Sequence, residues 1–343
     1  MKILIIIPTL PLSGGAQKVA LDIAIELAKE KEVHFLCFDS QINKAKNIQG
    51  INFHFILETK HTFRYYFLRG RCKVKSIIKN ISPDIIWVHK PSIIAYAAYS
   101  NKCKKILTFH NSEIHKYDYS FIKLWKFNFI AKFLVNKSDI VTTPSKHMQK
   151  YFSEYFDKNI SYMPNGINTN IFKQSNIERD NYTILYVGRI IESKNVRFLF
   201  EMAEIMPEYN FIFIGEGKLK NSIKNHNISF LGEKNADELP FYYSKSTFCI
   251  FPSQFENCPL VGLEAMACGA IVIASATGFE EYIDNKIDGY IIKDLEPEKI
   301  KRLIYDLSSN IPQNESVREK AIKKASKYNW SSILTQYNDY FKS

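Results

Sequence analysis

The chain alternates short apolar runs with longer helical stretches, and it does so twice along its 343 residues. Ile3–Ile7 is a continuous apolar run, which is typical of a strand buried on both faces of a parallel sheet. Strand–helix alternation of this kind predicts two Rossmann-like, doubly wound α/β domains, with ligands at the carboxyl ends of their strands. The predicted strands are Lys2–Ile7, Val33–Phe38, Ile51–Ile56, Asp84–His89, Lys105–His110 and Asp139–Ser145 in the first half, and Thr183–Gly188, Asn210–Gly215, Ile228–Gly232, Thr247–Ser253 and Ala270–Ser275 in the second.

The polar, turn-rich segment Pro164–Thr183 separates the two series of strands and is predicted to be an interdomain linker. The expected domains therefore cover residues 1–165 and 166–326, and residues 327–343 form a terminal helix. The N-terminal apolar run is too short for a signal peptide, and no stretch approaches the ~18 apolar residues that a membrane span needs.

The motif with the most chemical content is Phe255–Gly269, which follows a predicted strand and opens a helix. Asn257 is expected to cap this helix, with Pro259 in its first turn and Gly269 at its end. The first-turn N–H groups lack partners within a helix, so this helix start is a potential anion site. Leu260 and Val261 are expected to provide those groups.

Two carboxylates, Glu256 and Glu264, bracket the predicted anion site. One can accept hydrogen bonds from a sugar and the other from a ribose. The alternative is that one acid favours the helix dipole and the other is an ordinary surface residue.

Cationic residues and glycines form two further candidate phosphate contacts. Arg189 and Lys194 follow the predicted strand that ends at Gly188, and together they can neutralise a diphosphate. Gly14 and Gly15 precede a helix predicted over Gln17–Lys29 and allow close backbone approach. Alternatively, the cations are surface charges and the glycines form an ordinary strand-to-helix turn.

The segment Phe255–Gly269 resembles the E-x7-E motif of retaining glycosyltransferases, and its surroundings look like glycosyltransferase family four. The resemblance implies a GT-B fold, with an acceptor-binding first domain, a nucleotide-sugar-binding second domain and a C-terminal helix that crosses back. By the same resemblance, Glu264 binds the nucleotide ribose, while Glu256 lies against the donor sugar. Arg189 and Lys194 stabilise the leaving diphosphate.

The resemblance extends to further donor contacts and has two departures. His110, at the end of a predicted strand, is expected near the donor sugar, and Lys234 lies in a segment that resembles the base-reading loop. Gln17 replaces the family's usual Glu, and Asn195 replaces its usual Gly in a turn that Asn tolerates. The remaining donor-binding residues implied are Gly14, Gly15, Gly188, Asn257, Cys258, Leu260 and Val261.

Positive charge is concentrated in the first half of the chain. Residues 1–166 contain 25 Lys and Arg against 12 Asp and Glu, whereas the remainder contains 21 against 23. Such asymmetry suggests an anionic partner for the first half, either a membrane or a nucleic acid. The alternative is a solvated basic surface with no partner. The six cysteines form no C-x-x-C pair, and this usage favours a reducing compartment.

Two stretches carry most of this basic character. Lys60–Lys79 has seven cations and no acid, and Tyr117–Phe133 interleaves aromatic residues with lysines. Basic residues beside aromatic ones suit an anionic bilayer surface. The second stretch is equally compatible with an aromatic face in the core and a solvated basic face.

These observations predict a retaining glycosyltransferase that transfers a hexose or N-acetylhexosamine from a UDP- or GDP-sugar to a lipid-linked or glycan acceptor. The resemblance suggests synthesis of bacterial lipopolysaccharide, O-antigen or capsule, at the cytoplasmic face of the membrane as a peripheral protein. No metal cofactor is expected, since Arg189 and Lys194 supply positive charge. The alternatives are a GT-B epimerase, which should lack the E-x7-E pair, and a nucleic-acid-binding protein, for which no recognition motif is present.

Overall fold

The computed structural model describes residues 1–8, 14–37, 48–56, 70–110 and 121–342. The chain divides into two compact units, one formed by Met1–Pro164 with Ile333–Ser343 and the other by Asn165–Ser332. None of the helices in the described ranges is long and apolar enough to cross a membrane.

The first unit is built on a parallel sheet with the strand order β3-β2-β1-β4-β5-β6-β7. Its strands are β1 (Lys2–Ile6), β2 (Glu32–Cys37), β3 (Ile51–Phe55), β4 (Ile85–Val88), β5 (Lys104–Thr108), β6 (Ile140–Thr143) and β7 (Ser161–Tyr162). The helices are α1 (Gly15–Leu27), α4 (Arg71–Ile81), α5 (Ile93–Ala98), α6 (Phe121–Lys137), α7 (Lys146–Phe156) and the later part of α14 (Trp330–Lys342).

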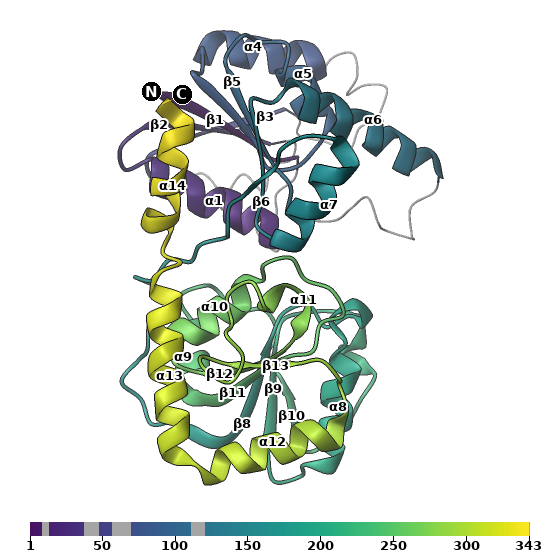
Figure 1. The fold of residues 1–343 in the computed structure, drawn as a ribbon, viewed down its shortest axis with the longest axis vertical. Helices are drawn as coiled ribbons and strands as arrows, with labels where there is room; N and C mark the ends of the chain where they lie inside the picture. Colours follow the sequence, from purple (N-terminus) through teal and green to yellow (C-terminus); the bar gives the residue numbers. More distant parts are fainter. Residues whose placement is uncertain (9–13, 38–47, 57–69, 111–120, 343) are drawn as a thin grey trace. The chain divides into compact units, whose positions relative to one another are not determined.

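Both faces of this sheet are covered (Figure 1). Leu4, Ile6 and Val88 join a core cluster with residues of α4, α5, α6 and α7 on one face. On the other face the ring of Trp87, which is fully buried, lies 4.6 Å from that of Tyr337 in α14. The continuous apolar run of β1 is therefore explained, because alternate residues enter two different cores.

The second unit has a parallel sheet with the order β10-β9-β8-β11-β12-β13. Its strands are β8 (Asp180–Val187), β9 (Asn210–Ile214), β10 (Ile228–Phe230), β11 (Ser246–Phe251), β12 (Ile271–Ser275) and β13 (Tyr290–Ile292). Its helices are α8 (Val196–Ile205), α9 (Leu239–Lys245), α10 (Leu260–Ala267), α11 (Ala276–Phe279), α12 (Pro297–Ser309) and α13 (Ile311–Ser326), with short 3-10 turns η3 (Glu192–Lys194) and η4 (Lys218–Asn221).

The prediction of two doubly wound parallel sheets is confirmed, and every predicted strand is present within a few residues of its expected ends. Two strands, β7 and β13, were not predicted. Both are edge strands of two or three residues, which are too short to produce a recognisable alternation.

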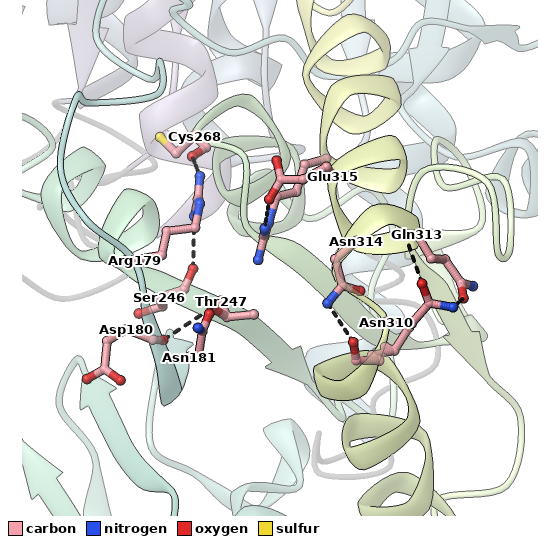
Figure 2. Close-up of polar contacts among 12 residues, drawn as sticks. Arg179, Asp180, Asn181, Ser246, Thr247, Cys268, Asn310, Gln313, Asn314 and Glu315 are labelled. Atoms are coloured by element: carbon pink, nitrogen blue, oxygen red, sulfur yellow. Dashed lines mark hydrogen bonds and ion pairs between the residues drawn. The ribbon is translucent and has the colours of Figure 1, made fainter.

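The segment predicted as a linker is packed against the second unit. Arg179 donates from its two terminal nitrogens to the carbonyls of Ser246 and Cys268, each at 3.0 Å (Figure 2). Phe172 is buried, and its ring lies 6.4 Å from that of Tyr243. These contacts fix the segment to the start of β11 and the end of α10, so it is part of the second unit and not a free tether.

The two ends of the second unit meet at Gly166. The N–H of Ile167 donates to the carbonyl of Tyr328 at 2.8 Å, and the N–H of Trp330 donates back to Ile167 at 3.2 Å. The ring of Trp330, only 3% exposed, lies directly over Gly166. Because Trp330 is anchored here, α14 starts in the second unit, and the chain joins the first unit only at Ile333, later than the boundary at 327 that the sequence suggested.

This close packing makes Gly166 sensitive to substitution. A Cβ atom at this position would lie 2.7 Å from the Trp330 ring, whereas a Cβ at Gly15 would have no described atom within 4 Å. We expect Gly166→Ala to lower the free energy of unfolding by about 1–3 kcal/mol, as overpacked sites do. Urea denaturation measures the effect, with Gly15→Ala as the matched control. Equal stability of the two variants would contradict this account of the junction.

Candidate active site

The predicted site residues of the second unit gather at one edge of its sheet. Gly188 and Arg189 follow β8, and Glu256 lies in the loop that follows β11. β8 and β11 are paired in parallel, so their carboxyl ends lie at the same edge. The sheet topology therefore brings together two loops that are far apart in the sequence.

Glu256 is the best-defined carboxylate at this edge. Its Oε1 atom accepts hydrogen bonds from the Lys194 ammonium and from the Ser253 hydroxyl, the latter at 3.0 Å. The Lys194 and Glu256 side chains are 18% and 16% exposed, respectively. A partly buried, charge-assisted pair of this kind is stronger than a surface ion pair. The structure thus joins the residue that the resemblance assigned to the donor sugar, Glu256, with one that it assigned to the leaving diphosphate, Lys194.

Lys194 is placed by a tight turn, η3, that ends at Asn195. Asn195 has φ 52° and ψ 37°, the left-handed conformation. The prediction that Asn would maintain this turn in place of Gly is confirmed. Helix α8 begins directly after it, at Val196.

Arg189 is exposed and sits on a rigid base. The buried Tyr186 hydroxyl donates to the Arg189 carbonyl at 2.8 Å. Gly188 has φ 151°, and a Cβ on Gly215 would lie 2.1 Å from the Gly188 carbonyl oxygen, so the loops after β8 and β9 are in direct backbone contact. Burial raises the pKa of Tyr186, and the nearby Glu256 raises it further, so its hydroxyl remains a donor.

Helix α10 begins at Leu260, and its N-cap is Pro259, with an extended backbone and no side-chain cap. The prediction that Asn257 caps this helix is therefore wrong. The extended ψ of Pro259, 127°, delays the helix start, and the Tyr282 hydroxyl holds the Pro259 carbonyl at 2.7 Å. Because Leu260 and Val261 open the helix, their N–H groups lack intrahelical partners, as an anion site requires.

The far end of α10 follows the prediction. The helix ends at Ala267, and Gly269 beyond it has φ 75°, the conformation that favours glycine after a helix.

Glu264 lies inside α10 and is only 2% exposed. The Tyr243 hydroxyl, also fully buried, donates to its Oε2 atom at 3.2 Å. Burial raises the pKa of Tyr243 well above its ordinary value, and the neighbouring Glu264 carboxylate contributes. The phenol therefore stays protonated as a hydrogen-bond donor to this carboxylate.

Lys234 and Cys258, two other residues predicted to bind the donor, are held by different contacts. Lys234 forms a 3.5 Å ion pair with Glu238, and its ammonium lies 5.9 Å from the Tyr242 ring centre. Cys258 is buried, and its carbonyl accepts a hydrogen bond from Asn165 at 2.9 Å. Burial raises the pKa of the Cys258 thiol to about 12, so the thiol is neutral at physiological pH.

In the first unit, Gly14 and Gly15 form the start of α1, slightly earlier than predicted. Gly14 is the N-cap, with no side-chain cap. A Cβ on Gly14 would overlap the Gln17 side chain, whereas among the described residues nothing lies within 4 Å of a Cβ on Gly15. Among the described residues, the packing around Gly15 therefore gives no reason for glycine there.

His110 also lies in the first unit, where β5 ends at Thr108 rather than at His110 itself. Its Nε2 atom is 2.9 Å from Nδ1 of His89, which follows the neighbouring strand β4, and the two rings are stacked. Burial lowers the pKa of His110 to about 4, with Lys90 adding to the effect. Burial lowers the pKa of His89 well below its ordinary value, and His110 adds to it. The pair is thus neutral at physiological pH.

Sequence reasoning missed His89, Ser253, Tyr243 and Tyr186. His89 and Ser253 are the last residues of predicted strands, so the rule that ligands gather there offered a signal for both. Tyr243 and Tyr186 lie within a helix and a strand, respectively, where a buried tyrosine is usual in a core. Among the described residues, no three His, Cys, Asp or Glu side chains come together as a metal-ligand set.

Two family models match this chain. One, described as glycosyl transferases group 1, covers residues 167–325, and the other, described as Glycosyltransferase Family 4, covers residues 13–171. The chain belongs to glycosyltransferase family four. It is therefore a glycosyltransferase. Arg189, Lys194 and Glu256, which contribute to the family resemblance, follow β8 and β11.

Relatives that match most of the chain agree with this assignment. The glycosyltransferase is 27% identical over 348 residues to an uncharacterised glycosyltransferase of Methanocaldococcus jannaschii, covering 97% of this chain and 96% of the relative. It is 27% identical over 293 residues to the capsular polysaccharide biosynthesis glycosyltransferase CapH of Staphylococcus aureus, covering 76% and 78%. The crystal structure of Anabaena HepE with UDP and glucose matches with a TM-score of 0.83 at 17% identity, over 100% of both chains. The two sheets are those of the GT-B fold.

The neutral histidine pair predicts a pH dependence of stability. The folded pKa of His110 is below the unfolded value of about 6.5, so the unfolded chain binds more protons between pH 6.5 and 4. Stability is retained above pH 6.5 and falls as the pH drops toward 4, by about 3 kcal/mol for His110 alone. Urea titrations at pH 7 and pH 5 should show a smaller difference for His110→Asn than for the unmodified enzyme. The same difference in both proteins would contradict the assignment.

Proposed function

We propose that this glycosyltransferase transfers a hexose or N-acetylhexosamine from a UDP-sugar, with retention of anomeric configuration, to a lipid-linked or glycan acceptor. The observation that carries the proposal is the Lys194–Glu256 pair beside the uncapped start of α10. A cation, a carboxylate and free N–H groups are the contacts that a sugar diphosphate needs. HepE was solved with UDP, which favours uridine over guanosine as the base.

In this proposal the donor diphosphate binds to the N–H groups of Leu260 and Val261 and to Arg189 and Lys194. Glu264 accepts hydrogen bonds from the ribose. Gly188, Asn257, Cys258 and Lys234 line the same donor. Gly14, Gly15 and His110 of the first unit are also proposed donor-binding or catalytic residues, as the resemblance implies.

The reaction breaks the bond between the anomeric carbon and the diphosphate oxygen, and the electron pair leaves with the diphosphate. The acceptor hydroxyl forms the new bond from the same face of the sugar, and its proton passes to the departing phosphate oxygen. Arg189, Lys194 and the α10 dipole offset the negative charge that develops on the leaving group. Because these groups supply the charge, we propose that transfer requires no divalent metal.

Nucleotide binding tests this arrangement. Calorimetric titration with UDP and GDP in EDTA should show UDP binding to the unmodified enzyme. Glu264→Ala and Arg189→Ala should each weaken UDP binding at least tenfold, since each removes a charged hydrogen-bond partner. Circular dichroism confirms that the variants are folded. Unchanged UDP affinity in both variants would refute the placement, and binding only after manganese is added would refute the metal-free site.

The acceptor side is proposed to work at an anionic membrane, where a cytoplasmic peripheral enzyme meets lipid-linked intermediates of bacterial surface polysaccharide such as lipopolysaccharide, O-antigen or capsule. CapH, a relative, is named for capsular polysaccharide biosynthesis. Helix α4 supports this proposal, because Val74, Ile78 and Ile81 face the core. Its solvent-facing cations are Arg71, Lys73, Lys75 and Lys79.

The other basic and aromatic residues of the two stretches give less support to a membrane-facing surface. Lys60, Arg64, Arg69, Tyr117 and Tyr119 lie outside the described residues. In α6, Phe133 packs against Tyr96 with ring centres 4.4 Å apart, whereas Phe129 is 57% exposed. The aromatic stretch therefore contributes both to the core and to the surface, and α4 carries the clearer membrane-facing charge.

Liposome flotation tests the membrane proposal. Each Lys or Arg near an anionic surface contributes about 1 kcal/mol, so changing the four α4 cations to Ser should weaken binding to phosphatidylglycerol vesicles at least tenfold. Higher salt should weaken it as well. The matched control removes one exposed Arg and three exposed Lys of the second unit: Lys293, Arg302, Lys320 and Lys323. If both variants bind vesicles alike, or the unmodified enzyme ignores them at low salt, the membrane proposal fails.

A further inference from the structure

We infer that Ser253 is a positioning residue that orients the Glu256 carboxylate, so that Oε1 stays with the protein and Oε2 is presented to the donor sugar. This inference rests on the proposed function, with Glu256 against the donor sugar as the family resemblance implies. It adds a second residue, with no direct role toward the nucleotide, on which the catalytic carboxylate depends.

Both of the hydrogen bonds to the Glu256 carboxylate go to the same oxygen atom. The Lys194 ammonium and the Ser253 hydroxyl both donate to Oε1. Within the described part of the chain, Oε2 accepts no hydrogen bond. A carboxylate has about four lone-pair sites, so this oxygen retains its full capacity to accept a hydrogen bond from a hydroxyl group. A lysine alone would not select one oxygen, because its ammonium is a point charge on a flexible stem.

Ser253 can perform this selection because it is itself fixed. It is separated from the end of β11 only by Pro252 and is 3% exposed. Its carbonyl accepts hydrogen bonds from the Ser275 hydroxyl at 2.6 Å and from the Thr277 hydroxyl at 3.4 Å. β12 ends at Ser275 and pairs in parallel with β11, so both partners come from the adjacent strand end. The hydroxyl that reaches Glu256 is thus anchored to the sheet.

The same neighbouring segment also fixes the backbone of Glu256. Gly278, in α11, has φ 75°, and a Cβ there would lie 2.6 Å from the carbonyl carbon and oxygen of Glu256. Only glycine permits this approach at this backbone conformation. The segment from Ser275 to Gly278 therefore supports the Glu256 main chain directly and its side chain through Ser253.

The consequence is a separation between sugar and nucleotide recognition. Loss of the Ser253 hydroxyl leaves Oε1 with Lys194 alone and lets the carboxylate turn, which misplaces Oε2 relative to the sugar. The nucleotide contacts proposed for Glu264 and Arg189 do not involve Ser253. Ser253→Ala should therefore reduce recognition of the sugar and kcat while UDP binding is retained.

The test uses the full-length enzyme with UDP, UDP-glucose and UDP-N-acetylglucosamine. We expect Ser253→Ala to lower kcat about tenfold with UDP affinity changed less than twofold. In a Glu256→Ala background, Ser253→Ala should cause no further loss, because residues that act through one group are not additive. The ratio of nucleotide-sugar affinity to UDP affinity, measured by calorimetry, gives the same comparison when turnover is too slow to follow. Ser244→Ala, which removes the hydroxyl of another buried serine, controls for a general loss of stability.

The outcomes distinguish a failure of the positioning role of Ser253 from a failure of the proposed function. An unchanged kcat and affinity ratio in Ser253→Ala, or an equal loss in the Glu256→Ala background, would overturn the positioning role. Loss of UDP binding together with activity would also overturn it, since that indicates a general structural role. Full activity of Glu256→Ala would instead overturn the proposed function on which the inference rests.

Discussion

The parallel pairing of β8 with β11 is the constraint on which the site depends. It fixes two strand ends side by side, and the loops that leave them carry the cations and the first carboxylate. A shift of the ladder by one residue would exchange the side chains that pack on the two faces of the sheet. The core of the second unit therefore fixes where the segments that carry Lys194 and Glu256 begin.

Electrostatics then explain why the site is suited to an anion. Lys194 is neutralised by Glu256, so the sheet edge does not hold an isolated partly buried charge. The first N–H groups of α10 have no partner within the helix, and Arg189 is exposed. A diphosphate would add the negative charge that these donors lack.

Much of the fold could be predicted because both sheets are buried on two faces, and their strands are continuous apolar runs such as Ile3–Ile7. The edge strands β7 and β13 could not be predicted, since two or three residues carry no period. The packing of the predicted linker could not be predicted either. Polar, turn-rich sequence predicts irregular backbone, but it does not show that Arg179 finds carbonyl partners on the second unit.

The parts of the site that depend on backbone conformation were predictable from the sequence. The parts that depend on tertiary contacts between side chains were not. The helix start near Leu260 and the left-handed turn at Asn195 followed from residue types. The Asn257 cap was wrong because a preference for capping cannot anticipate the Tyr282 bond to Pro259. Partners such as Ser253 lie outside the motif, and only the tertiary structure places them at Glu256.

The central claim is that this site cleaves a sugar from a nucleotide on the face from which the new bond forms. Proton NMR of the enzyme with α-linked UDP-glucose, UDP-galactose and UDP-N-acetylglucosamine, in water as the slow acceptor, tests it without knowledge of the natural acceptor. The account predicts that the free sugar appears first as the α-anomer, before mutarotation, and that Glu256→Ala suppresses its release. First appearance of the β-anomer, or no release from any of these donors by the unmodified enzyme, would contradict it.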